Sequence, residues 1–218
     1  MAPLQELLIF LDKTVAGGDL GVAIILLTVL VRLVLAPFFY KATKNQVLLQ
    51  RLQPELRQIQ QQHKDNREQQ ALAMMALYRR HQINPFSSFL LILLQLPILI
   101  ALYRVFLNLP PQLESFAFDL LNLKETSIIV TGLAVVFQYF QGRLLLPPTA
   151  DPTAKNMVWL GPVLTLVFLA YLPSAVGLYW LTTTLFSIGQ QLYLNQQLKK
   201  DGTITTNNAK NPGAGRFL

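Results

Sequence analysis

Arg32 stands in the middle of a long apolar segment, residues 20–40 (LGVAIILLTVLVRLVLAPFFY). About 20 apolar residues are enough for a helix to cross a bilayer. A charge at the centre of such a helix costs at least about 2.5 kcal/mol, so intramembrane arginines usually face a bundle interior or a wet cavity and mark a working site. A shifted span or a snorkelling side chain is the alternative, but snorkelling works best near helix ends. Arg32 lies about 18 Å along the predicted helix.

The composition supports a polytopic membrane protein with little room for anything else. Of the 218 residues, 52% are hydrophobic and only 13% are charged, whereas soluble domains average about 25% charged residues. The length accommodates one membrane domain and no large soluble domain. The sequence contains no cysteine, which excludes disulfides, thiol catalysis and Cys-based metal sites.

Five apolar segments predict an all-α membrane protein with five transmembrane helices. They cover about residues 20–40, 86–107, 127–146, 157–172 and 175–194, within a core of residues 19–198. Asp19 is the expected N-cap of the first helix, and Asn84 with Pro85 is a start signal for the second. Pro147 and Pro148 should end the third helix. The last two helices are joined by so few residues that they must form an antiparallel hairpin.

The two ends of the chain are predicted to lie outside this bundle. Within residues 1–18, Leu4, Leu7, Leu8 and Leu11 recur at helical spacing, which indicates an amphipathic helix lying on the membrane surface. A frayed terminus is the alternative. The segment 199–218 is polar and rich in Gly and Asn, so we expect a disordered tail.

A polar segment, residues 41–82, separates the first two spans and predicts a helical hairpin. Pro54 should bend its first helix or start a new one. The apolar stripes expected to pack together are Leu48, Leu52, Leu56 and Ile59 on one helix and Ala71, Met75 and Tyr78 on the other. Met74 and Met75 are predicted either as hairpin core or as adaptable contacts for varied apolar substrates. The charges of the hairpin can equally form a plain solvated face.

The distribution of Lys and Arg predicts the orientation. Most of the 18 basic residues fall in the hairpin, in the loop between the third and fourth spans, and in the tail. Because cytoplasmic loops carry the excess of Lys and Arg, we expect the N-terminus outside and the hairpin and C-terminus in the cytoplasm.

Further polar residues accompany Arg32 inside the predicted spans. They are Gln95 in the second, Gln138 and Gln141 in the third, and Thr182, Thr183, Thr184, Ser187, Gln190 and Gln191 in the fifth. No acidic residue within a span can neutralise Arg32. Buried polar groups need partners or water, so a lone cation predicts a hydrated cavity whose anion arrives with a ligand. Interhelical hydrogen bonding is the plainer interpretation of the glutamines, and Trp180 could be an interface anchor.

Catalysis has little support in the sequence. The two histidines, His63 and His81, both lie in the polar hairpin. The chain has no HExxH motif, no glycine-rich phosphate loop and no paired intramembrane carboxylates. It offers no cluster of metal ligands either. We therefore expect a non-enzyme without cofactor or metal.

Four segments of the chain together are typical of a known family. They are LTVLVRLVLAPFFYK around Arg32, LQPEL at residues 52–56, ALYRRHQINPFSSFLLILLQLPILIALYRV at 76–105 and LPSAVGLYW at 172–180. In these segments the chain resembles the YidC membrane protein insertases. The order and spacing of these segments cover most of the chain. The resemblance is to the short bacterial form, without a large extracytoplasmic domain.

The resemblance implies an insertase located in the bacterial inner (plasma) membrane. A groove centred on Arg32 would receive nascent membrane proteins and release them sideways into lipid, with Gln95, Gln138, Gln141, Trp180, Thr183 and Ser187 as wall residues and Met74 and Met75 as hairpin contacts. The implied partners are nascent membrane proteins, the Sec translocon, the ribosome, a targeting receptor and membrane lipids. Sequence-specific binding of nucleic acid is not expected.

Two other classes of protein remain open on the residues alone. A small transporter or channel could use Arg32 to bind an anion, although the sequence shows no internal repeat and no second charged gate. A structural subunit of a larger membrane complex could bury its polar residues at protein contacts. The accessibility of position 32 from the two sides of the membrane distinguishes the three classes.

Overall fold

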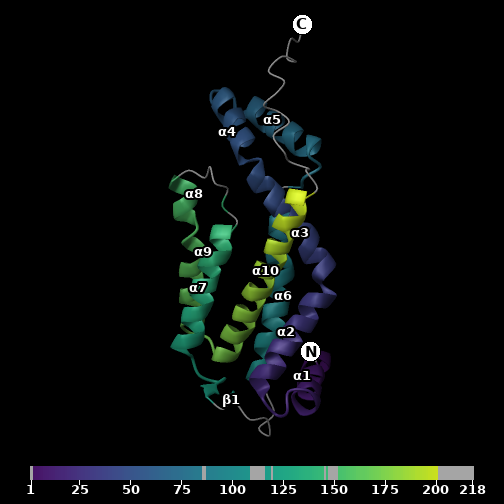
Figure 1. Cartoon of the computed structure of the whole chain (residues 1–218). Coiled ribbons are helices and arrows are strands. Elements are labelled where there is room, and N and C mark those ends of the chain that lie inside the picture. Colours follow the sequence, from purple (N-terminus) through teal and green to yellow (C-terminus); the bar gives the residue numbers. More distant parts are fainter. Residues whose placement is uncertain are drawn as a thin grey trace.

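The computed structural model describes residues 2–84, 87–108, 116–118, 120–144, 146 and 152–200, and these are mostly helical. The helices are α1 (Ala2–Thr14), α2 (Leu20–Val34), α3 (Ala36–Arg51), α4 (Gln53–Gln62), α5 (Arg67–Arg80), α6 (Ser87–Leu107), α7 (Ile128–Leu144), α8 (Pro152–Met157), α9 (Leu160–Leu169) and α10 (Ser174–Lys200). Two short strands, β1 (Phe116–Ala117) and β2 (Leu121–Asn122), pair antiparallel with Phe116 opposite Asn122. Figure 1 shows α2, α6, α7, α9 and α10 forming an elongated bundle, with α4 and α5 at one end and β1 at the other.

The first predicted span is not one continuous helix. α2 ends at Val34 and α3 begins at Ala36, and the two helices meet at an angle of 72°. Pro37 lies in the first turn of α3, where its missing N–H and fixed φ suit a helix start rather than a helix interior. The prediction of a single helix over residues 20–40 is therefore wrong at this point, although Asp19 caps α2 as expected, accepting from the Val22 N–H at 3.0 Å.

The other predicted spans correspond to helices with shifted ends. α6 continues across Pro97, α8 precedes α9, and α10 runs to Lys200, past the predicted start of the tail. Residues 201–218 and the three prolines at 85, 147 and 148 lie outside the described residues. By length and mean hydropathy, none of the described helices qualifies alone as a membrane-crossing helix, and only the bent pair α2 and α3 qualifies together. The count of five spans stays a prediction.

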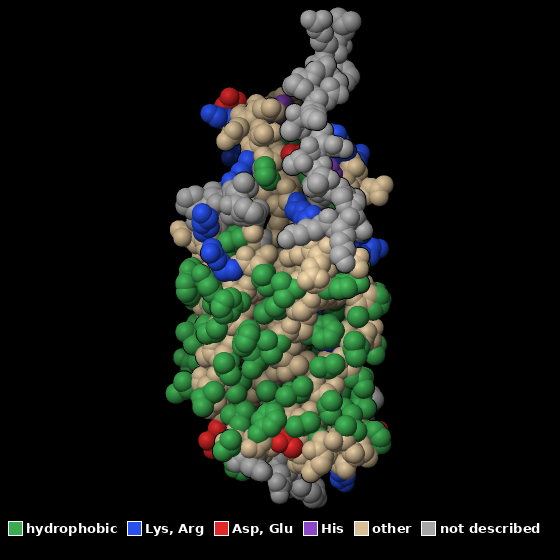
Figure 2. Space-filling model, in the orientation of Figure 1, with side chains coloured by type: hydrophobic (Ala, Val, Ile, Leu, Met, Phe, Trp, Pro, Cys, Tyr) green, Lys and Arg blue, Asp and Glu red, His purple; other side chains and the backbone are tan. Residues whose placement is uncertain are grey.

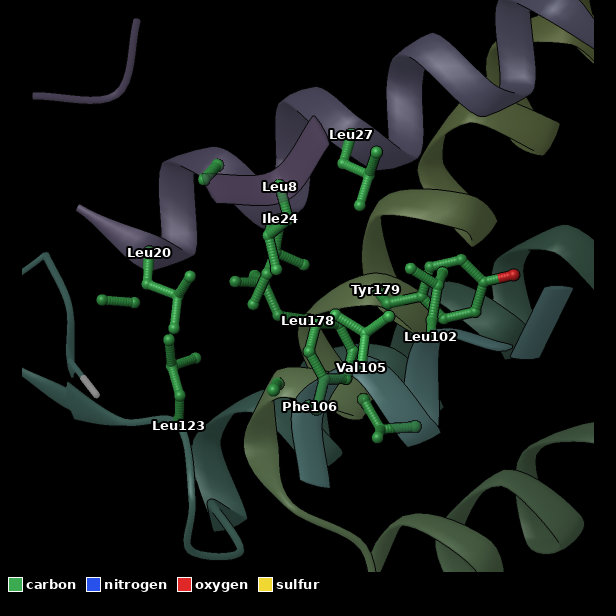
Figure 3. Packing of buried hydrophobic residues seen from close by; sticks show 14 of the residues in the cluster. Leu8, Leu20, Ile24, Leu27, Leu102, Val105, Phe106, Leu123, Leu178 and Tyr179 are labelled. Atoms are coloured by element: carbon green, nitrogen blue, oxygen red, sulfur yellow. The ribbon is translucent and has the colours of Figure 1, made fainter. Parts of the chain in front are cut away.

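The main core lies between α1, α2, α6 and α10. Figure 3 shows Leu8, Ile24, Leu102 and Leu178 among the side chains that converge there, and these four are buried. α1 contributes Leu8 and Leu11 to this core, and the Gln5 side chain donates to the Asn108 carbonyl. The N-terminus is thus not frayed in the described part; its predicted place on a membrane surface stays a prediction.

α4 and α5 pack on each other around a separate small core. Leu52, Leu56, Leu77 and Ile83 are its buried members, and Leu48, Ile59, Met74 and Tyr78 are among those packed against it. Pro54 starts α4, as predicted. The predicted stripe on the second helix is confirmed at Tyr78 and wrong at Ala71 and Met75, which are exposed. Met74 and Leu77 belong to the hairpin core in their place.

A loop at the opposite end ties α2 to α10. The Asp19 carboxylate that caps α2 also accepts a hydrogen bond from the Phe118 N–H at 2.6 Å. The Ser174 N–H, at the start of α10, donates to the Glu125 carbonyl at 2.7 Å. Gly21 lies so close to Ala117 that a Cβ there would overlap the Ala117 side chain. We call residues 116–118 and 120–125 the clasp, because they hold the first turns of two groove helices together.

The surface divides into three zones along the bundle. Figure 2 shows hydrophobic side chains spread over the middle, Lys and Arg concentrated toward the end that carries α4 and α5, and Asp and Glu side chains at the clasp end. Large exposed apolar side chains include Leu33 on α2, Ile129 and Phe140 on α7, and Val167 and Phe168 on α9. An apolar surface of this size normally has an apolar environment around it.

Candidate functional site: a polar groove around Arg32

A cavity of about 510 Å³ opens between α2, α3, α6, α7 and α10. All seven residues predicted from the sequence as groove residues line it: Arg32, Gln95, Gln138, Gln141, Trp180, Thr183 and Ser187. These seven residues come from four of the predicted apolar segments and are brought to one place. We call this cavity the groove.

Helical periodicity explains which residues reach the groove. On α10, Trp180, Thr184, Ser187 and Gln191 follow one another at intervals of three and four residues, so they share one face of the helix. Thr182 is off this face and bonds back to the Leu178 carbonyl. Gln138 and Gln141 lie on one face of α7 for the same reason. Polar residues that are separated in the sequence therefore lie along one face of each helix and form the polar walls of the groove.

Arg32 occupies the last turn of α2 and is only 6% exposed. Its Nη2 donates to the Gln95 Oε1 at 3.3 Å, and its guanidinium carbon lies 4.1 Å from the centre of the Phe39 ring. A guanidinium carries five N–H donors, and this is the one side-chain bond that Arg32 makes within the described residues. Its nitrogens do not count among the buried atoms without a partner, so the rest of the head group borders the open groove.

Two interhelical contacts hold the groove wall in place. Gln95 on α6, which accepts from Arg32, donates in turn to the Tyr179 hydroxyl on α10. The Thr184 hydroxyl on α10 shares its proton between the Trp180 carbonyl at 2.9 Å and, more weakly, the Gln138 Oε1 on α7 at 3.4 Å. The interhelical interpretation of these two glutamines therefore holds alongside their exposure to the groove.

The groove carries positive charge and no counter-charge of its own. Among the described residues, its lining includes neither Asp nor Glu. A contact between a basic and an acidic side chain lies away from the groove, on the hairpin, where the His81 Nε2 is 4.0 Å from the Glu55 Oε2. Among the described residues, no group of His, Cys, Asp and Glu side chains is arranged to hold a metal ion. The arrangement can attract an anionic group; it offers no nucleophile–base pair.

Sequence reasoning missed eight lining residues: Phe39, Thr43, Gln46, Leu96, Leu99, Gly142, Thr184 and Gln191. Phe39, Thr43 and Gln46 come from α3, at intervals of four and three residues, so one face of α3 points into the groove. The sequence did not predict these three residues as groove residues, because the bend between α2 and α3 changes the direction of the chain. Gln191 was noticed as polar but not placed in the groove; it is 2% exposed and lines it.

Met74 and Met75 lie away from the groove. Met74 borders a second cavity of about 600 Å³ on the hairpin, together with Leu56, Arg57 and Tyr78. Met75 is 48% exposed, so it is not a core residue. Of the two predicted roles for this pair, packing applies to Met74, and contact with a substrate stays a prediction for both.

Comparison with known proteins agrees with this geometry. The family model described as "60Kd inner membrane protein" matches residues 10–201. The membrane protein insertase MisCA of Bacillus subtilis is 34% identical over 86% of this chain and 74% of its own length. The membrane protein insertase YidC of Fusobacterium nucleatum is 34% identical, with 88% of this chain and 94% of the relative covered.

Longer relatives and a solved structure share the same region. The YidC of Nitratidesulfovibrio vulgaris is 36% identical over 88% of this chain, which spans only 38% of that relative. A crystal structure described as an active YidC insertase with the first transmembrane domain resolved superposes with a TM-score of 0.71 at 27% identity, covering 88% of this chain and 45% of that one. The chain belongs to the 60Kd inner membrane protein family, whose relatives include the YidC and MisCA membrane protein insertases.

Proposed function

We propose that this protein is a membrane protein insertase that receives the polar part of a nascent membrane protein in the groove and releases its apolar segments sideways into the bilayer. The observation that carries the proposal is a buried arginine on the wall of an open polar groove whose lining holds no acid. An anion supplied by another polypeptide completes such a site. The names of the relatives favour the same activity.

The groove would lower the barrier to insertion in two ways. A polar tail that enters it travels through less hydrocarbon and exchanges water for the amides and hydroxyls of Gln95, Gln141 and Ser187, which reduces the desolvation cost. An acidic side chain on the tail would also be attracted to Arg32, and this attraction is stronger at low dielectric than in water. The membrane potential then contributes about 2.3 kcal/mol per charge per 100 mV, so the chain needs no nucleotide.

Lateral release would follow α7 and α10. Both helices present groove residues on one face and exposed apolar side chains elsewhere, such as Val136 on α7 and Leu185 on α10. An apolar substrate helix that slides along them passes from a polar wall to a lipid-like surface without crossing water, and hydrophobic partition drives the last step.

The orientation and partners form part of the same proposal. The basic zone near α4 and α5 would face the cytoplasm, with the N-terminus outside and the C-terminus inside. The hairpin, with Met74 and Met75, would meet the substrate first. The Sec translocon, the ribosome, a targeting receptor and membrane lipids are the proposed partners.

The proposal is tested by site-specific crosslinking in cells. A photoreactive residue at Gln141 or Trp180 should crosslink to nascent membrane proteins during their synthesis, because both side chains line the groove. The control is the same probe at Val167, which is exposed on α9 and does not line the groove. Equal crosslinking from all three positions, or none from the two groove positions, would contradict the proposal.

Labelling of a single cysteine separates the insertase from the two alternative classes. The chain has no native cysteine, so Arg32→Cys and Ser187→Cys each create one reporter, and the second retains the arginine. A polar thiol reagent should reach both from the cytoplasmic side only. Labelling from both sides would favour an anion channel, and absence of labelling would favour a structural subunit.

A further inference from the structure

Two described residues of the groove have a buried polar side-chain atom without a hydrogen-bond partner, Thr183 through its Oγ1 and Gln191 through its amide nitrogen. Gln191 is the one whose unpaired atom can only donate. It lies on α10, is 2% exposed and lines the cavity. Its amide nitrogen Nε2 is fully buried and has no hydrogen-bond partner within the described structure. Buried amides nearly always have a partner, so this donor calls for an explanation.

The neighbouring hydroxyls on the same face satisfy themselves within the helix. Thr184 donates to the Trp180 carbonyl at 2.9 Å, and Ser187 donates to the Thr183 carbonyl at 2.9 Å. Short hydroxyl side chains reach the carbonyl one turn back, whereas the Gln191 amide nitrogen makes no such bond. Its donor is therefore held in the groove wall without an internal acceptor.

Its position along α10 suits contact with an entering chain. Gln191 lies three turns beyond Trp180, about 16 Å along the helix, in the direction of the end that carries α4 and α5 (Figure 1). Gln46 and Thr43 of α3 line the same cavity. A tail that moves from the hairpin toward Arg32 would pass Gln191 on its way.

An inserting polypeptide brings the complementary group. Its extended tail carries main-chain carbonyls, and often carboxylates, that lose water in the groove and need donors. Arg32 supplies a charged donor; Gln191 supplies a neutral one. We infer that the Gln191 amide is a further substrate-binding group of the groove, which donates a hydrogen bond to a carbonyl or carboxylate oxygen of the inserting polypeptide. This inference rests on the proposed insertase function.

The test measures insertion rate and thermal stability of Gln191→Leu in the full chain. Leu has a similar volume and no donor, so insertion should slow about fivefold, the effect of roughly one neutral hydrogen bond. The melting temperature should stay the same or rise, because no buried donor is left without a partner. Gln191→Met, a second variant without a donor, covers the case in which Leu fails to pack.

The control variant is Gln190→Leu. Gln190 is the preceding residue but lines a separate, apolar hollow with Tyr40 and Tyr193, so insertion should stay at the normal rate. Two substrates are compared, one with an acidic tail and one with each tail acid replaced by its amide. Slowing of both identifies the bound oxygen as a main-chain carbonyl; slowing of the acidic one alone identifies a carboxylate.

Normal insertion of both substrates by the Leu and Met variants overturns the inference, as does equal slowing by Gln190→Leu. Arg32→Ala, run in parallel, separates this failure from failure of the proposed function. If Arg32→Ala slows the acidic substrate and the Gln191 variants do not, only the role of Gln191 is wrong. If no variant changes insertion, the groove itself is not the path of the substrate.

Discussion

Arg32→Ala is expected to slow the insertion of substrates with acidic tails by at least about tenfold. Opposite charges about 4 Å apart attract by about 4 kcal/mol at an effective dielectric constant of about 20, and the loss of only about 1.4 kcal/mol is a factor of ten. Arg32 is the cation of the groove lining, so no neighbour replaces it. Insertion is measured with a reconstituted protein and a substrate whose tail carries one or two acids.

Arg32→Lys should largely restore the insertion rate, because the position of the charge matters more here than the forked arrangement of the guanidinium N–H donors. An ammonium can also stay near the Phe39 ring, which lies beneath the guanidinium. Arg32→Glu should slow acidic substrates further and should favour a substrate whose tail acids are replaced by lysines. Normal insertion of acidic substrates by Arg32→Ala would show that the electrostatic role is wrong. Strongly apolar substrates are a control, since they depend least on the charge.

The polar residues of the groove could be predicted from the sequence because polar groups are rare inside apolar segments. Arg32, Gln95 and Gln141 stood out for this reason, and each lines the cavity. Where two polar residues are adjacent in the sequence, it was harder to predict which of them faces the groove. Gln190 and Gln191 are next to each other in the chain but about 100° apart around the helix, and they line different hollows. Only the orientation of α10 decides which of them meets the groove.

Other features could not be predicted from the sequence because they depend on tertiary contacts. The run 20–40 is apolar on both sides of Leu35, so hydropathy did not reveal the 72° bend that turns Phe39 over Arg32. α5 has an almost unbroken set of Ala, Leu and Met from residue 71 to 77, and such a run does not select one face; this is why Met75 was placed in the hairpin core. The strands of the clasp have two residues each, too few for an alternating pattern.

Gly21→Ala is expected to destabilise the protein by about 1–3 kcal/mol, the usual effect of overpacking a close contact. Gly21 is buried at the start of α2, and a methyl group there would overlap the Ala117 side chain, which is itself fully buried in the clasp. To relieve the overlap, Ala117 must move, and with it the Phe118 N–H that donates to Asp19. The melting temperature in detergent is the first measurement.

Ala117→Gly combined with Gly21→Ala gives the decisive comparison. The double variant moves the methyl group from the clasp to α2, so most of the lost stability should return, with a coupling energy between about 0.5 and 3 kcal/mol. Gly132→Ala on α7 is the matched control, because a Cβ there meets nothing within 4 Å and Ala suits a helix better than Gly. If the clasp closes the outer end of the groove, Gly21→Ala should also let a polar thiol reagent reach Ser187→Cys from the outside, and the double variant should prevent it. Additive losses in the double variant would mean that the two residues do not share a contact, and that α2 and the clasp are held together elsewhere.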